Sequence, residues 1–340
     1  MHHRLPAFAL VLLLWVAVAA LACSGDDAPV ATPAMISTPP EVASTAVTPA
    51  RVLEPGPTAT PEPPRGPLAG RRICIDPGHD DYWVPGAAGR DRAGRLPRHA
   101  RGFSLNEHEL TLAVASRLQM LLEAEGAATC VTRKPAIEGG GLQSAPVDFN
   151  GDGRVRTRGQ AVEDEPERIQ PRIDYANAFG ADVLLSVHFN GLDDRTAYGT
   201  EVYFTDGGPR RNDGRRLGAA VLAGLLAEMR AAGFPALDRG LKSDAYQRYS
   251  PGETARLFAA NAATIRANGF DPANCQACYR LLTLGANPMS ARPGAYTGVL
   301  VEVEFLSNPD VVEGFLLRPD SLDIIARGLA QGLMAYFNRF

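Results

Sequence analysis

Short apolar runs that end in turn residues alternate along this chain with segments of helical periodicity. The first run, Arg72 to His79, breaks at Pro77-Gly78 and predicts a buried strand with His79 in the loop past its carboxyl end. Further strands are predicted at 127–132, 183–187, 200–204, 281–284 and 299–303. Helices are predicted from Ser104 to before Gly126, and at 172–179, 212–232 and 321–337.

This alternation predicts an α/β fold, a mostly parallel twisted sheet with helices on both faces. We expect a single domain over 68–340, with insertions at about 134–168 and 243–294. The helix that opens at Ser104 carries Glu107 three residues on, a capping-box pattern.

The first 67 residues have a different pattern. Residues 1–22 combine a positive start with a short apolar run and predict a signal peptide. Small residues before Cys23 and polar residues after it resemble a bacterial lipoprotein processing site, so Cys23 is the expected lipid anchor. The alternative is an ordinary cleaved signal with an incidental cysteine. Residues 23–67 are rich in Pro and Thr and predict a disordered tether.

These features predict an exported protein, held on the outer face of the cell membrane or secreted into the cell wall. The formal net charge is −4, which gives no indication of a nucleic-acid partner. Membrane contact is expected through the lipid anchor only. Nothing in the pattern indicates an oligomeric state.

The remaining four cysteines form two pairs. Cys74 and Cys130 lie on strands that we expect to be neighbours, and we predict buried free thiols there. Cys275 and Cys278 have the spacing of half a zinc site, but no second pair completes it. A short-loop disulfide is the prediction for an exported protein.

One loop has part of a calcium-binding pattern. Asp148, Asn150 and Asp152 alternate as in the first half of such a loop, and a glycine follows. The closing acidic ligand is missing because the twelfth position is Gly159. Calcium at these three residues is therefore one reading, and an Asn/Asp/Gly-rich surface turn is the other.

Two predicted strands each end near a histidine, His79 and His188. Ligands of open α/β sheets bind at the carboxyl edge, so both side chains are candidate metal ligands. Catalytic zinc takes three protein ligands and a water. The third ligand is expected among Glu107, His108 and Glu109, and Glu107 is preferred because it begins the helix and faces the edge of the sheet.

A hydrolytic zinc site also needs a group that moves protons. Glu302, on the last predicted strand, is the best candidate for this acid/base role. Taken alone, the same residue could be an ion-paired strand residue.

Six motifs in order carry a family resemblance. They are Ile75-Asp76-Pro77-Gly78-His79, Glu107 ahead of Leu110-Thr111-Leu112-Ala113, Arg172 with Ala176-Asn177, Ser186-Val187-His188-Phe189-Asn190, Arg239-Gly240-Leu241-Lys242, and Leu300 to Asn308. Together they resemble the zinc-dependent N-acetylmuramoyl-L-alanine amidases of bacterial cell walls.

The resemblance implies Zn²⁺ on His79, Glu107 and His188, with Glu302 as the catalytic acid/base. It implies peptidoglycan as substrate, cleaved at the amide between N-acetylmuramic acid and L-alanine. Arg172 and Asn190, inside the matching motifs, are expected to bind substrate.

The sequence departs from the family pattern at Glu304, where glycine is usual. On a regular strand Glu304 shares a face with Glu302 unless a bulge intervenes, and two neighbouring carboxylates would raise one pKa. Two other functions stay open: a zinc hydrolase of another exported amide or peptide, and a non-catalytic cell-wall-binding protein on the same fold.

Overall fold

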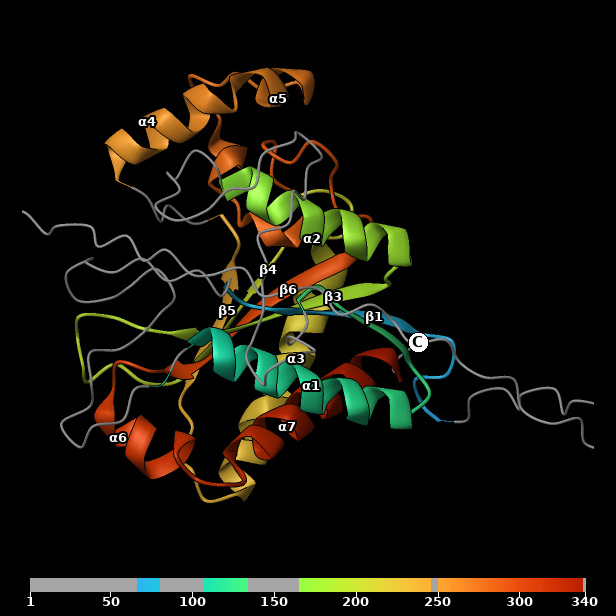
Figure 1. The fold of residues 1–340 in the computed structure, drawn as a ribbon, viewed down its shortest axis with the longest axis vertical. Coiled ribbons are helices and arrows are strands. Elements are labelled where there is room, and N and C mark those ends of the chain that lie inside the picture. The colour runs from blue at the N-terminus through green and yellow to red at the C-terminus, as the bar shows by residue number, and fades with distance from the viewer. Residues whose placement is uncertain (1–65, 80–104, 106, 134–164, 246–249, 339–340) are drawn as a thin grey trace, which may run out of the picture. The chain divides into compact units, whose positions relative to one another are not determined.

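The computed structural model describes residues 66–79, 105, 107–133, 165–245 and 250–338, whose arrangement Figure 1 shows. The predicted signal peptide, Cys23, residues 24–65 of the tether and the Asp148–Asp152 loop lie outside the described residues. The centre of the described part is a six-stranded sheet in the order β2-β1-β3-β6-β4-β5. Its strands are β1 (Arg72–Pro77), β2 (Ala128–Val131), β3 (Val183–Asn190), β4 (Thr200–Phe204), β5 (Asp238–Ser243) and β6 (Thr297–Phe305).

The sheet is mostly parallel, as predicted. Only the β4–β6 pair is antiparallel among the strand pairs of the described residues. The carboxyl ends of β1, β3 and β6 therefore meet at one edge, where β4 and β5 begin. Polar side chains at the ends of five strands come together along this edge.

Helices cover both faces of the sheet (Figure 1). One face carries α1 (Glu107–Ala124), α3 (Arg211–Ala231) and α7 (Ser321–Phe337), which share the largest hydrophobic core with β1, β3, β4 and β6. The other face carries α2 (Glu165–Phe179) and the short 3-10 helix η3 (Leu282–Leu284). The remaining helical segments are α4 (Pro251–Ala260), α5 (Ala262–Ala267), η2 (Gln276–Tyr279), α6 (Pro309–Val311) and η4 (Val312–Leu316).

Helices α3 and α7 lie unusually close because glycines face each other at their crossing. A Cβ atom on Gly332 would lie 2.5 Å from the Cα of Val221, and one on Gly224 would lie 2.5 Å from the carbonyl oxygen of Gly328. No side chain fits at such distances, so the small residues permit the contact. This packing supports the sheet from the face opposite α2.

The predicted elements agree with the structure at several places and fail at others. The predictions at 200–204 and 321–337 match β4 and α7. The strand predicted at 281–284 is wrong, because Leu282–Leu284 form η3, which ends at Gly285 with φ 77°. Leu281 and Leu284 are buried against Tyr203 and Leu300, and Leu282 is buried in the cluster around Cys275 and Cys278. The apolar run therefore reflects burial and not extended backbone.

One further strand and the start of one helix were not predicted. Strand β5 lies at the edge of the sheet, and its residues are mostly half-buried, so it has no apolar run. Helix α2 begins at Glu165, before the predicted start at Arg172, and contains Pro171. Tertiary contacts offset the cost of that proline. On either side of it, Gln170 donates to the carbonyl of Arg292 and Arg172 enters a buried network.

Both cysteine pairs are disulfides in the structure. The predicted free thiols at Cys74 and Cys130 are a correction: the two residues lie directly opposite each other in the parallel β1–β2 pair, with Cα atoms 4.5 Å apart. That separation lies within the range found for disulfides. The predicted Cys275–Cys278 disulfide is confirmed.

The predicted insertion around 243–294 forms a small structure with its own core. Helix α4 starts at Ser250, whose side chain forms a capping box with Glu253. Buried residues of α4, α5 and η2 pack around the Cys275–Cys278 disulfide. In the described part of the chain, no helix combines the length and the apolar character that crossing a membrane requires.

Candidate metal centre and active site

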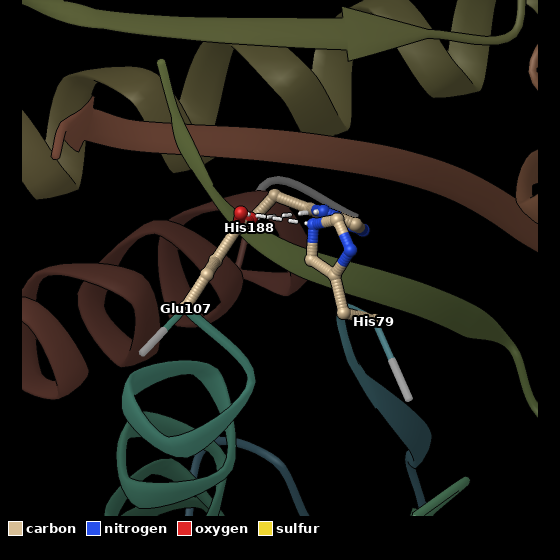
Figure 2. A group of neighbouring side chains, drawn as sticks. All are labelled: His79, Glu107 and His188. Carbon is tan, nitrogen blue, oxygen red and sulfur yellow. Dashed lines mark ion pairs between the residues drawn. The ribbon is translucent and has the colours of Figure 1, made fainter. Parts of the chain in front are cut away.

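His79, Glu107 and His188 come together at the carboxyl edge of the sheet (Figure 2). Each offers one ligand atom, and these atoms lie within 4.8 Å of one another. The three side chains come from three elements: the loop after β1, the start of α1, and β3. The residues expected as metal ligands therefore meet in space, although more than 100 positions separate the first from the last.

Glu107 lies between the two histidines. One carboxylate oxygen is 2.9 Å from His79 Nε2 and the other is 3.3 Å from His188 Nδ1. The backbone N–H of Phe189 donates to the same carboxylate at 2.8 Å. Burial raises the pKa of Glu107, but the neighbouring histidines outweigh it and lower the pKa to about 2. An ionised carboxylate is what a metal ligand requires.

The half-buried ring of His188 packs against the backbone of Gly78. A Cβ atom on Gly78 would lie 2.5 Å from the imidazole ring, so only glycine leaves room for this ring. Burial lowers the pKa of His188, and the hydrogen bond with Glu107 opposes that shift without reversing it. The imidazole is therefore held in the neutral form that binds metals.

His79 adopts a left-handed backbone conformation with φ 62°, the one described non-glycine residue to do so. Such a conformation costs of order 1 kcal/mol or more and persists only where the surroundings hold it. Arg172 supplies part of that support. It donates to the carbonyl of His79 at 2.7 Å and to that of Pro77 at 3.0 Å.

Asp76 forms a buried ion pair with Arg172. Its carboxylate, 1% exposed, accepts from Arg172 at 2.9 Å and from the hydroxyls of Ser186 and Thr132. Burial raises the pKa of Asp76, but the Arg172 guanidinium and the hydroxyl donors outweigh it and lower the pKa. The charge pair is thus buried and satisfied, which fixes the guanidinium beside the His79 loop.

Arg133 supports the same loop from the other side. Its Nη2 donates to the carbonyl of Gly78 at 3.1 Å, to that of His108 at 2.7 Å, and to the hydroxyl of Thr111 at 3.1 Å. Two buried arginines therefore bind the carbonyls of Pro77, Gly78 and His79 in succession. We call these two residues the arginine clamp.

The other two candidates for the third ligand lie outside the group. His108 is buried, its carbonyl binds Arg133, and its ring nitrogen is 3.9 Å from Glu109. Neither residue belongs to the cluster of ligand atoms around His79. Helix geometry explains the choice: successive side chains point about 100° apart, so only one of the three faces the sheet edge.

Glu302 lies beside the metal group. It is the direct partner of His188 in the parallel β3–β6 pair, so both side chains stand on the same face of the sheet. A register shift follows between His188 and Asn190, which pairs with Phe305. This β-bulge adds one residue to β6 after Glu302 and breaks the simple alternation.

On a regular strand Glu304 would share a face of the sheet with Glu302, but the bulge between them breaks this alternation of faces. The Glu304 carboxylate, 0% exposed, accepts from the N–H of Gly199 at 2.7 Å, and its second oxygen has no hydrogen-bond partner in the described part of the chain. Burial raises the pKa of Glu304 to about 7. The sequence predicted a raised pKa from repulsion between Glu302 and Glu304, whereas the cause of the rise at Glu304 is burial.

The two residues expected to bind substrate are both engaged within the protein. Arg172 is 7% exposed and belongs to the arginine clamp. Asn190 donates to Glu201 at 2.9 Å and accepts from Gly191 N–H at 2.7 Å. Asn190 is half-buried at the site edge, whereas the contacts of Arg172 lead us to propose that it positions His79.

Sequence reasoning did not single out Asp76, Arg133 or Glu201. An aspartate at the end of an apolar strand was the available signal for Asp76, since a buried charge requires partners. Arg133 and Glu201 had no local signal of this kind. Their roles depend on contacts between segments far apart in the sequence.

The fold and the site define an α/β protein with a two-histidine, one-glutamate group fit to hold a metal at the carboxyl edge of its sheet. The family model described as N-acetylmuramoyl-L-alanine amidase matches residues 73–335. The chain belongs to this family, which confirms the resemblance drawn from its motifs.

Individual relatives agree with this membership. The chain is 26% identical over 182 residues to the N-acetylmuramoyl-L-alanine amidase LytC of Bacillus subtilis, a match that covers 54% of this chain and 27% of LytC. It thus spans about a quarter of that curated relative.

Two solved structures resemble the chain in fold. One is the CwlD amidase of Clostridioides difficile in complex with the GerS lipoprotein: 16% identity, TM-score 0.50, covering 79% of this chain and 100% of that one. The other is the amidase AmiC2 of Nostoc punctiforme: 19% identity, TM-score 0.45, covering 81% and 99%.

Proposed function

We propose that this protein is a zinc-dependent N-acetylmuramoyl-L-alanine amidase that hydrolyses the amide between N-acetylmuramic acid and L-alanine in peptidoglycan. The observation that carries the proposal is the meeting of His79, Glu107 and His188 on a chain of this family. Two histidines and one carboxylate form a known hydrolytic zinc set.

The three side chains fit zinc in charge as well as in number. At neutral pH Glu107 is ionised, because the neighbouring histidines lower its pKa, and His188 is neutral, because burial lowers its pKa. His79 is the most exposed of the three, with 30% of its side chain accessible. When bound, zinc lowers the pKa of its water and polarises the scissile carbonyl.

The protein supplies the proton transfers. In this proposal Glu302 takes a proton from the attacking water and gives one to the nitrogen of the leaving L-alanine. Its place opposite His188 supports this role, because both side chains share one face at the same level of the sheet. Glu107 holds metal and takes no part in these transfers.

Digestion of purified muropeptides by the exported protein tests the proposal. Mass spectrometry is expected to show free stem peptides that begin with L-alanine, together with glycans that have lost them. Chelation is expected to abolish the reaction, and added zinc to restore it. His79→Ala and His188→Ala are expected to lose both zinc and activity, since each removes one of three protein ligands.

The same experiment separates the alternatives. Stoichiometric zinc without muropeptide cleavage would favour a zinc hydrolase of another exported amide or peptide. Absence of zinc together with binding to cell walls would favour a non-catalytic binder. Zinc bound at full occupancy by either histidine variant would remove that histidine from the ligand set.

We also propose that the protein acts outside the cytoplasm, as a lipoprotein anchored through Cys23 or as a secreted enzyme. The supporting observation is the amino-terminal pattern of an apolar run, small residues and cysteine.

A further inference from the structure

A cluster of polar side chains continues the row of site residues across the sheet. Glu201 on β4 is the direct partner of Glu302 in the antiparallel β4–β6 pair, just as His188 is its partner on β3. His188, Glu302 and Glu201 therefore stand side by side on one face. We call Glu201 and the four side chains bound to it the Glu201 cluster: Asn190, Tyr203, Arg239 and Lys242.

Glu201 is buried, ionised and fully hydrogen-bonded. Its side chain is 3% exposed. One oxygen accepts from Asn190 at 2.9 Å and from the Tyr203 hydroxyl at 3.0 Å. The other accepts from Arg239 Nε at 2.8 Å and from the Lys242 ammonium. Burial raises the pKa of Glu201, but these donors outweigh it and hold the pKa below its usual value.

The cluster has more positive than negative charge. Arg239 and Lys242 contribute one positive charge each and Glu201 one negative charge, which leaves a surplus of one. Both cationic side chains are also accessible, at 31% and 36% exposure. The ammonium of Lys242 has three N–H donors, and among the described residues Glu201 is its one hydrogen-bond acceptor.

This arrangement fixes two cations that would otherwise be mobile. Long basic side chains lose roughly 2 kcal/mol of rotamer entropy when they are immobilised. Because Glu201 already orders both side chains in the folded protein, binding of an anion does not carry this entropy cost again. A buried carboxylate that holds two half-exposed cations beside a catalytic candidate is thus a preorganised anion site.

The cluster lies near enough to the metal group for the stem peptide of the proposed substrate to reach it. Neighbouring strands lie about 4.8 Å apart, so Glu201 on β4 is about 10 Å from His188 on β3. In a stem peptide, the residue after L-alanine lies one Cα step of about 3.8 Å further on, which places its α-carboxyl group roughly 7 Å from the scissile carbonyl. Where that residue is joined onward through its side chain, its α-carboxyl group is either free or amidated.

We propose that Lys242 and Arg239 bind the free α-carboxylate of this second stem-peptide residue, so that the enzyme prefers acidic over amidated stem peptides. The inference rests on the proposed function and names the substrate class of the same site. Charge-assisted hydrogen bonds between guanidinium or ammonium and carboxylate supply the discrimination. An amide in the same place presents no negative charge and brings N–H donors against the two cations.

Two muropeptides that differ only at this carboxyl group test the inference. With the full exported protein, kcat/KM is expected to be roughly tenfold higher for the free acid than for the amide. Lys242→Met is expected to bring this ratio towards one, mainly through KM for the acidic substrate. Lys242→Arg keeps the charge and is expected to keep most of the preference.

Arg327→Gln is the matched control. Arg327 of α7 pairs with Glu228 of α3, on the opposite face of the sheet, so this variant also loses one positive charge. Its substrate ratio is expected to equal that of the wild type. Thermal unfolding and zinc content check that Lys242→Met is folded and loaded.

Each outcome has a distinct meaning. Equal kcat/KM for the two substrates in the wild type would overturn the inference, whatever the variants do. A Lys242→Met protein that loses activity equally on both substrates would assign Lys242 a structural role and overturn it as well. Cleavage of neither muropeptide would refute the proposed function itself, whereas cleavage of both at equal rates refutes only the preference.

Discussion

At the scale of single residues, the two glutamates of β6 are the strongest test of the site. Glu302 stands opposite His188, and Glu304 lies beyond a bulge against Gly199. Glu302→Gln cannot accept a proton, so turnover is expected to fall by roughly 10²-fold or more. Zinc content, measured on the same preparation, is expected to stay at one per chain.

Glu304→Gln serves as the matched comparison. Because the bulge separates Glu304 from the row that contains His188, this variant is expected to keep most of its turnover. If Glu304→Gln loses activity while Glu302→Gln keeps it, the catalytic carboxylate is Glu304. Loss of zinc from Glu302→Gln would make Glu302 a ligand.

Glu304 also predicts a pH dependence of stability. Burial raises its pKa in the folded protein to about 7 from the usual 4.5 of a glutamate. The folded state therefore holds this proton more tightly than the unfolded state, so the stability that it contributes is present below pH 4.5 and is lost as the pH rises to 7. The loss is about 3 kcal/mol at most.

Denaturant unfolding of the wild type and of Glu304→Gln, each loaded with zinc, measures this effect. Other carboxylates titrate in both proteins, so the difference between their unfolding free energies isolates Glu304. Relative to the wild type, Glu304→Gln is expected to gain stability between pH 4.5 and pH 8. A constant difference over that range would contradict the raised pKa.

At the scale of elements, α2 and the segment just after β2 hold the loop after β1 through the arginine clamp. Arg172→Lys keeps a positive charge for Asp76 but cannot reach the carbonyls of Pro77 and His79 together. The variant is expected to fold and to bind zinc roughly tenfold more weakly, the low end of the range for supporting residues. Competition with a chelator measures that affinity.

The exposed side of α2 offers a matched control. Arg292 pairs with Asp174 of α2 at 2.6 Å, with 60% of the arginine side chain exposed. Arg292→Lys makes the same chemical change without touching the loop, so its zinc affinity is expected to equal that of the wild type. An equal loss in both variants would show that α2, and not the clamp, limits zinc binding.

The two disulfides are expected to differ in their contribution to stability. The Cys74–Cys130 disulfide joins β1 to β2 across 56 positions, whereas Cys275–Cys278 spans three. Chain entropy in the unfolded state gives about 4 kcal/mol for the longer loop and about 2 kcal/mol for the shorter one. Alanine replacement of each pair, followed by denaturant unfolding, compares them. A larger loss for the shorter loop would contradict this reasoning.

At the scale of the whole molecule, the amino-terminal segment predicts where the enzyme acts. If Cys23 is lipidated, Cys23→Ser is expected to move the protein from the membrane fraction to the soluble exported fraction. Ser24→Ala leaves the cysteine in place and is expected to stay with the membrane. An unchanged distribution of Cys23→Ser would mean that Cys23 carries no lipid.

The sequence by itself determined the class of fold, the family and the three residues that now form the candidate metal group. His79 and His188 follow apolar strands, and Glu107 begins an amphipathic helix. Such signals are local, since the period of apolar residues and the turn residues that end it can be read within one segment. The carboxyl edge of a parallel sheet then brings the ends of distant strands together.

Only the tertiary structure decided the rest. The bulge after Glu302, the disulfide at Cys74 and Cys130, and the edge strand β5 depend on register and neighbours, which no single segment encodes. The arginine clamp and the Glu201 cluster have the same origin. Each is a set of buried charges that is stable only when side chains from separate elements meet and pair. The local sequence around each residue therefore carries no signal of its role.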